Sequence, residues 1–214
     1  MDIKKTANLL INFTINRLAE IFGIAVFIAG TLLLAALLTF SPEDPNFIFP
    51  QNTEIKNILG FQGSFVSDLF FQSIGLISYL FSLTLIVSGI NIFRVKEFFL
   101  IIENIFFATL YSISGTFFLA HFYPDAFTLY INGNGGFIGF YLDQTFLNSL
   151  ILINKTISYF VLIILNFTLF LISINFHPIK FYKIIKKLFK NFSNKEDTNY
   201  TNKSEVINEY IPQD

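Results

Sequence analysis

Four long runs of uncharged, mostly apolar residues divide the chain. They cover residues 21–40, 69–93, about 98–121 and 156–176. A bilayer core about 30 Å thick needs roughly 20 residues of α-helix to cross it, so each run is long enough to span a membrane. Only the third run holds an acid, Glu103, near its beginning. The pattern predicts an all-α membrane protein with four transmembrane helices.

The distribution of positive charge predicts the orientation of these helices. Twelve of the fourteen Lys and Arg residues lie before the first run, between the second and third, or after the fourth. Only Lys56 and Lys155 lie on the opposite side. Because short cytoplasmic segments are enriched in Lys and Arg, we expect both termini to be cytoplasmic.

The segment 179–192 follows the fourth run and combines apolar positions at helical spacing with lysines on the remaining faces. Such a helix lies on a membrane surface and binds anionic lipid headgroups. We therefore expect a basic amphipathic interfacial helix that closes a transmembrane domain at 1–192. Residues 193–214 are polar and are expected to form a disordered tail or the start of a linker. The membrane-surface lysines are Lys180, Lys183, Lys186, Lys187 and Lys190.

Small or weakly polar residues recur every four positions in the third run. Close packing and hydrogen bonds drive helix association in lipid, and small residues allow that close approach. The stripe predicts a helix-packing face, either within this chain or between copies. Ala25 and Ala29 in the first run are a weaker case. The packing residues of the third run are Ala108, Ser112, Thr116 and Ala120.

Ionisable residues near the ends of the runs are expected at the membrane boundary. Asp68 and Lys155 precede helices, and His121 ends one; an acid at a helix N-terminus also complements the helix dipole. Glu103 lies near a predicted end, although an acid inside a membrane can also serve an ion relay. A small transporter or channel is the alternative function that this residue leaves open.

Composition argues against catalysis and metal binding. The chain has no Cys and two His, which excludes disulfides and thiolate or multi-histidine metal sites. A net charge of −1 gives no basic surplus for a nucleic acid backbone. The glycine-rich stretch 132–139 lacks the Lys-Ser/Thr of a phosphate-binding loop, and we read it as a turn leading into a short amphipathic segment at 137–150. We expect no enzymatic activity, no cofactor, no metal and no direct nucleic acid binding.

Residues 57–80 resemble the start of the second membrane helix in the FtsK/SpoIIIE family of bacterial DNA translocases. Two weaker resemblances accompany it: the turn Ser41-Pro42-Glu43-Asp44-Pro45-Asn46, and the Gly-Gly-x-x-Gly motif of the second outer loop. Together they cover about residues 17–192. The residues that carry the resemblance are Gly60, Gly63, Asp68, Gln72, Gly75, Tyr79, Gly135, Gly136 and Gly139.

The resemblance implies a non-enzymatic anchor in the bacterial inner membrane. In that family an N-terminal membrane domain oligomerises as a hexamer, holds a DNA-pumping ATPase at the division septum and contacts other division proteins. The 214 residues contain no segment that resembles the ATPase motor. We therefore expect a membrane anchor and oligomerisation module that supports cell division and chromosome segregation, with membrane lipids, further copies and division proteins as partners.

Overall fold

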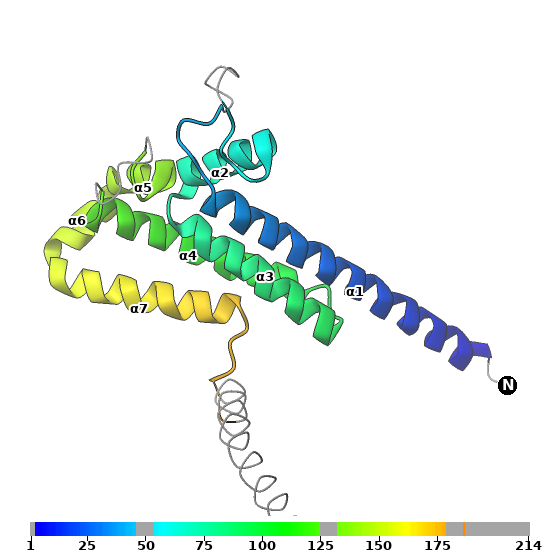
Figure 1. Ribbon diagram of the computed structural model, residues 1–214. Coiled ribbons are helices and arrows are strands. Elements are labelled where there is room, and N and C mark those ends of the chain that lie inside the picture. Colours follow the sequence, from blue (N-terminus) through cyan, green and yellow to red (C-terminus); the bar gives the residue numbers. More distant parts are fainter. Residues whose placement is uncertain (1–2, 46–53, 125–131, 179–185, 187–214) are drawn as a thin grey trace, which may run out of the picture. The chain divides into compact units, whose positions relative to one another are not determined.

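A computed structural model describes residues 3–45, 54–124, 132–178 and 186, and these residues form seven α-helices and no strand (Figure 1). The all-α prediction is confirmed. The chain divides into two units, Met1–Asn175 and Phe176–Asp214, and all seven helices lie in the first. The helices are α1 (Ile3–Leu38), α2 (Gly60–Ile74), α3 (Ile77–Val95), α4 (Leu100–Phe122), α5 (Gly136–Asp143), α6 (Phe146–Ile153) and α7 (Lys155–Ser173).

Four of these helices are long and apolar enough to cross a membrane: α1, α3, α4 and α7. This confirms the prediction of four candidate spans. The predicted segment 137–150 is two helices, α5 and α6, which are bent by 71° relative to each other. Together they pass the same test of length and composition, so the described part of the chain holds up to five spans if the bent pair is one of them.

The first predicted span, 21–40, has the wrong beginning, because α1 starts 18 residues earlier at Ile3. No Gly or Pro interrupts residues 3–20, so nothing breaks the helix at the charged residues that bounded the prediction. Figure 1 shows the first part of α1 running beyond the ends of the other helices of this unit.

The second predicted span, 69–93, is wrong as one continuous helix. Gly75 has φ +57° and ψ −141°, which ends α2. A new helix, α3, begins two residues later at Ile77. Hydropathy does not reveal this break. One glycine among apolar residues hardly changes the mean hydropathy of the segment, although its backbone leaves the helical region.

The other two spans lie close to their predicted bounds, with α4 at Leu100–Phe122 and α7 at Lys155–Ser173. The Asn154 side chain begins α7 by accepting a hydrogen bond from the Ile157 N–H at 3.1 Å. Such an N-cap stabilises a helix by about 1 kcal/mol. The predicted interfacial helix at 179–192 lies outside the described residues except for Lys186, and the predicted tail at 193–214 lies wholly outside them.

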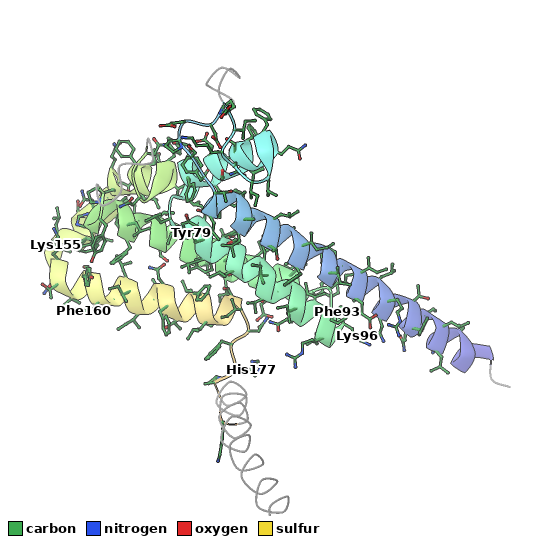
Figure 2. All side chains as sticks on the ribbon, viewed as in Figure 1. Tyr79, Phe93, Lys96, Lys155, Phe160 and His177 are labelled. Atoms are coloured by element: carbon green, nitrogen blue, oxygen red, sulfur yellow. The ribbon has the colours of Figure 1, made fainter. Side chains whose placement is uncertain are left out.

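The helices pack in the order α1, α3, α4, α7, with α2 and α5 at one end of the row (Figure 1). We call this end, which holds Tyr79, the capped end; Phe93 and Lys96 mark the open end (Figure 2). The buried core at the capped end joins Leu33 and Leu37 of α1 to Phe71 of α2. The outward surfaces of the helices are strongly apolar, as lipid contact requires.

Glycines bring α1 and α3 into backbone contact. A Cβ atom on Gly89 would lie 2.4 Å from the Phe27 nitrogen, and one on Gly23 would lie 2.7 Å from the Phe93 nitrogen. Gly30 approaches Ile86 just as closely. With no hydrophobic drive between helices in lipid, this close approach is what holds the pair together.

A polar seam joins α3, α4 and α7 inside the unit. The Thr84 hydroxyl lies 2.9 Å from the Tyr111 hydroxyl and 3.2 Å from that of Ser173. Nearer the open end, the Asn104 amide lies 2.8 Å from Ser88 Oγ and 2.7 Å from Asn175 Nδ2.

The seam also caps the end of α7. The Asn91 amide donates to the Ile174 carbonyl at 3.2 Å. The last carbonyls of a helix have no partner within it. A side chain from α3 therefore satisfies a backbone carbonyl at the end of α7.

We predict that Gly89→Ala destabilises the protein by roughly 1–3 kcal/mol, the usual range for overpacking. The added methyl group meets backbone of α1, which cannot move aside as a side chain can. Thermal unfolding in detergent, followed by circular dichroism, measures the loss. Thr168→Leu, which enlarges an exposed position on α7, is the control. Equal unfolding temperatures for the two variants would contradict the glycine contact.

Candidate functional site

The break between α2 and α3, at Gly75 and Leu76, contacts the turn before α5, at Asn134 and Gly136. We call this contact the glycine junction. The Leu76 N–H donates to the Asn134 carbonyl at 3.0 Å, while the Gly75 N–H donates to the Phe71 carbonyl at 3.0 Å. Two segments separated by about sixty residues of sequence thus meet through their backbones at the capped end.

Side chains are excluded from the glycine junction. A Cβ on Gly75 would lie 1.9 Å from the Asn134 oxygen, and one on Gly136 would lie 2.6 Å from the Gly75 nitrogen. Both glycines have positive φ, +57° and +61°. Only glycine adopts this backbone without strain, so both positions need glycine for space and for conformation.

The same motif packs on α4. Cβ atoms on Gly135 and Gly139 would lie 2.4 Å and 2.3 Å from the Thr116 carbonyl oxygen. Both glycines also lie against Ala120. The structure therefore brings the Gly-Gly-x-x-Gly motif together with two residues of the predicted packing stripe, and the partner of this part of the stripe is α5 of the same chain.

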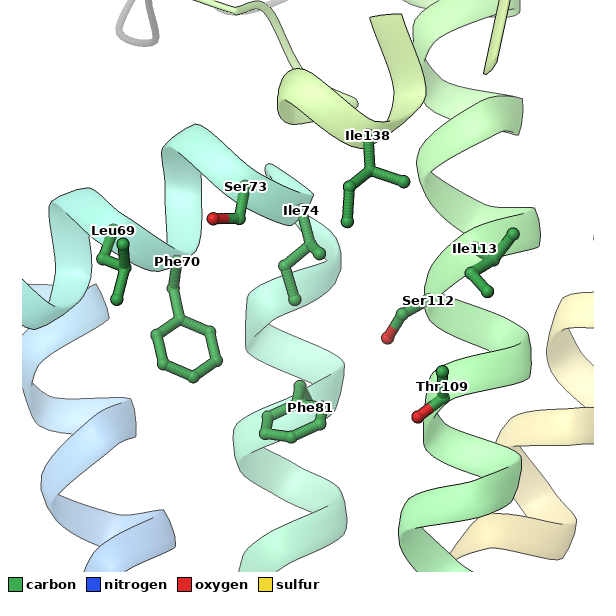
Figure 3. A pocket seen from close by; sticks show the side chains of 9 residues that line it. All are labelled: Leu69, Phe70, Ser73, Ile74, Phe81, Thr109, Ser112, Ile113 and Ile138. Atoms are coloured by element: carbon green, nitrogen blue, oxygen red, sulfur yellow. The ribbon is translucent and has the colours of Figure 1, made fainter. Parts of the chain in front are cut away.

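The rest of the predicted stripe lies deeper along α4. Ala108 is fully buried and belongs to a core cluster with Ile77 and Tyr111. Ser112 lines a cavity of about 280 Å³ beneath α2 and α5, and Figure 3 shows its side chain on α4, across from Ile74 and Phe81. The Ser112 hydroxyl is buried and has no hydrogen-bond partner among the residues that the structure describes.

Side chains reinforce the glycine junction. The Asn132 amide donates to Gln72 Oε1 at 2.9 Å, and Gln72 Nε2 donates to Asp68 Oδ1 at 3.5 Å. Asn134 is buried and donates to the Tyr123 carbonyl at 2.6 Å. Two of the resembling residues, Asp68 and Gln72, therefore connect α2 to the turn before α5.

A second contact at the capped end holds the segment between α1 and α2. The buried Asp44 carboxylate accepts hydrogen bonds from the backbone N–H groups of Lys56 and Asn57 at 2.8 and 2.9 Å. The Asn57 amide donates to the Ala36 carbonyl of α1 at 2.9 Å. A Cβ on Gly63 would lie 2.1 Å from Asn57 Oδ1, so Gly63 leaves room for this amide.

Charged groups on the surface of the capped end are paired. Lys56 donates to the Glu43 carboxylate, and this pairing lowers the pKa of Glu43 and raises the pKa of Lys56. His121 Nδ1 lies 2.8 Å from Asp143 Oδ1, which ties the end of α4 to α5. The Lys155 ammonium lies over the Phe122 ring, 5.8 Å from its centroid.

A family model described as the 4TM region of the DNA translocase FtsK/SpoIIIE matches residues 16–186. The chain belongs to this family. The match begins within α1 and runs beyond α7, so it covers the glycine junction, most of the first candidate span and all of the other three.

Curated relatives carry the same family name. The DNA translocase FtsK of Rickettsia typhi is 26% identical over 169 residues, which are 79% of this chain and 22% of that protein. The FtsK proteins of Rhizobium meliloti and Pseudomonas putida are 29% and 35% identical over 98 and 82 residues. These stretches cover 46% and 38% of this chain, and 11% and 10% of the two relatives. The chain thus spans about a fifth or less of the length of these relatives. No solved structure matches it significantly.

Two of the residues that carry the family resemblance lie away from the glycine junction. The Tyr79 hydroxyl donates to the Leu37 carbonyl at 3.3 Å and so joins α3 to the end of α1. Gly60 begins α2 with φ +66°, and a Cβ there would meet no atom within 4 Å. Apart from Gly60, the resembling residues therefore occupy three neighbouring contacts of the capped end.

The structure places the acidic residues Asp68 and Glu103 at different points of their helices. Asp68 lies in the middle of α2, eight residues past its beginning, so the helix-dipole argument for it is wrong. That argument failed because α2 begins at Gly60, before the hydrophobic run. Glu103 lies in the first turn of α4 and is exposed.

Sequence reasoning missed Asp44, Asn57 and Asn134 as buried hydrogen-bonding residues. Asp44 and Asn57 stand within segments that resemble the family, and Asn134 directly precedes one, so their positions were a usable signal. The sequence carried no signal that these three side chains are buried, because Asp and Asn in turns are usually exposed. Only the contacts show that they hold the capped end together.

We predict that Gly75→Ala destabilises the protein more than Gly60→Ala does. Both substitutions force a non-glycine residue into a left-handed backbone, at about 1–2 kcal/mol each, but only Gly75→Ala also meets backbone. Thermal unfolding in detergent measures the two losses. A Gly60→Ala loss as large as that of Gly75→Ala would contradict the contact with Asn134.

Proposed function

We propose that this chain is the inner-membrane anchor and oligomerisation module of an FtsK-like DNA translocase, supporting cell division and chromosome segregation at the septum. The single observation that carries the proposal is the family match over residues 16–186, which coincides with the helical membrane region. The curated relatives are named DNA translocases. The module itself is proposed to be non-enzymatic, with the motor activity residing elsewhere in such proteins.

The open end is proposed to face the cytoplasm. Glu20 of α1 forms ion pairs there with Arg17 and with Lys96, the latter at 2.9 Å. Lys96 and Arg94 belong to the basic residues that predict a cytoplasmic side. Charged groups that end a transmembrane helix sit at the headgroup level, and this cluster supports placing the inner membrane surface near Glu20.

The capped end is then proposed to face outward and to meet other division proteins. It exposes large aromatic side chains on α2 and α5, and aromatic residues are enriched both at membrane interfaces and at protein contacts. Lipids and further copies, a hexamer by family resemblance, are the other proposed partners, and no direct nucleic acid contact is proposed. The exposed aromatic residues are Phe61, Phe65, Phe137, Phe140 and Tyr141.

We predict that a C-terminally fluorescent-tagged copy of the chain gathers at midcell late in constriction in dividing bacterial cells. An anchor of a septal machine must reach the septum through its membrane region or through the partners of that region. Fluorescence microscopy of growing cells measures this. A uniform envelope signal from a full-length, stably inserted fusion would overturn the proposed septal role.

We predict that Asp68→Ala impairs the support of division more than it impairs membrane insertion. Asp68 connects α2 to the Asn132 turn through Gln72, so its loss disturbs the capped end and leaves the apolar spans unchanged. Cell length and membrane fractionation, measured in cells that depend on this membrane region, report the two effects. Gln62→Ala, at an exposed position of the same helix, is the control. Full rescue by an inserted Asp68→Ala chain would remove any special role of Asp68.

A further inference from the structure

The cavity beside Ser112 lies between α3 and α4, beneath α2 and α5 (Figure 3). We call it the α3–α4 cavity. Its volume is about 280 Å³, and its walls are mostly apolar. Leu69 and Ile113 line it and are also 53% and 43% exposed, so they mark its mouth on the lipid-facing surface. The cavity can therefore be entered from the side, within the membrane.

Ser112 turns its hydroxyl into this cavity. Figure 3 shows its oxygen pointing away from α4, toward the space beside Ile74 and Phe81. Ser112 is only 7% exposed, and its hydroxyl finds no hydrogen-bond partner in the described part of the chain. Because a buried hydroxyl without a partner is unfavourable, a ligand that suits this cavity offers a hydrogen-bond acceptor at Ser112.

The other Ser and Thr residues of α4 satisfy their hydroxyls within the helix. Thr109 donates to the Ile105 carbonyl at 2.9 Å. Ser114 and Thr116 also donate to carbonyls of the preceding turn. Such bonds are a common solution for a hydroxyl inside a helix. Ser112 differs from these three residues, because its hydroxyl faces the cavity and remains able to donate to a ligand.

The cavity lies near one boundary of the hydrocarbon core. The 19 residues of α3 span about 28 Å, close to the roughly 30 Å of a bilayer core, so Ile77 marks the boundary at the capped end. Ile77 clusters with Ala108 and Tyr111, and a Cβ on Gly115 would lie 2.7 Å from its side chain. Ser112 stands between these contacts along α4. It is thus about level with the first turn of α3, where the polar ester groups of phospholipids meet the hydrocarbon.

Hydrocarbon suits the cavity better than water does. Apolar cavities stay free of water, and one of roughly 150 Å³ binds the six-carbon ring of benzene. The α3–α4 cavity is roughly twice as large. It can therefore take a segment of hydrocarbon chain about twice the size of that ring, which lipid can supply through the mouth between Leu69 and Ile113.

We propose that the α3–α4 cavity binds an acyl chain of an ester-linked phospholipid from the leaflet at the capped end. The chain enters between Leu69 and Ile113 and packs against Phe81, while its ester carbonyl accepts a hydrogen bond from the Ser112 hydroxyl. An acyl ester fits because it joins a hydrocarbon chain to an acceptor that carries no donor of its own. The inference rests on the proposed placement of the chain in the membrane, and it names the site at which one of the proposed lipid partners binds.

Two matched lipids and two matched variants test the proposal. Dioleoyl phosphatidylglycerol carries ester carbonyls, and its dialkyl ether analogue has the same headgroup and chain length without them. Ser112→Ala removes the hydroxyl that faces the cavity. Thr109→Val removes a hydroxyl from the same cavity that is already bonded within α4. Native mass spectrometry of the purified chain in detergent, titrated with each lipid, measures the binding of the first lipid molecule.

We expect the unchanged chain to bind the ester lipid roughly three- to tenfold more tightly than the ether lipid, which is the preference that one neutral hydrogen bond gives. Ser112→Ala is expected to abolish the preference, and Thr109→Val to keep it. Ile138→Phe, which fills the cavity from α5, is expected to weaken the binding of both lipids. Equal binding of the two lipids by the unchanged chain, or a preference that survives in Ser112→Ala, would overturn the proposal.

The position of the chain in dividing cells separates this failure from that of the proposed function. A chain that gathers at midcell but shows no preference for the ester lipid would remove the cavity site and keep the septal anchor. A chain whose preference depends on Ser112 but whose envelope signal is uniform would keep the cavity site and remove the septal role.

Discussion

The structure depends on one constraint: a backbone N–H or C=O group inside a bilayer must find its partner within the protein. Helices meet this demand along their length, and the difficulty lies at their ends and breaks. At the break after α2, the Leu76 N–H donates to the Asn134 carbonyl. At the end of α7, the Asn91 amide donates to the Ile174 carbonyl. Polar groups thus complete the hydrogen bonds at these helix ends, while others, such as Thr84 and Tyr111, pair between helices.

Glycine allows the helices to pack closely, although lipid provides no hydrophobic drive for helices to associate. Gly23 and Gly89 bring α1 against α3, and Gly75 and Gly136 bring α3 against the turn before α5. Backbone contacts of this kind leave little room for adjustment. Gly75 and Gly136 place such a contact at the capped end, which suits a membrane region proposed to present a defined surface to its partners.

The row arrangement of the helices bears on how copies could associate. α1 lies at one edge of the row and packs on α3 and α2. An edge helix keeps much of its surface for other partners.

The sequence by itself determined that four segments are candidate spans, because hydropathy is a local property and each segment is long enough to register. It also determined the family, since the spacing of Gly75, Gln72 and Tyr79 can be read without a structure. It could not show that Gly75 ends a helix, that Asp68 lies in mid-helix, or that α1 begins at Ile3. Those features depend on which backbone groups meet, and Gly75 meets Asn134 across about sixty residues. Only the tertiary structure decided these features. The lack of a side chain at Gly75 matters only because another segment, the backbone of Asn134, packs into the space that a side chain would occupy.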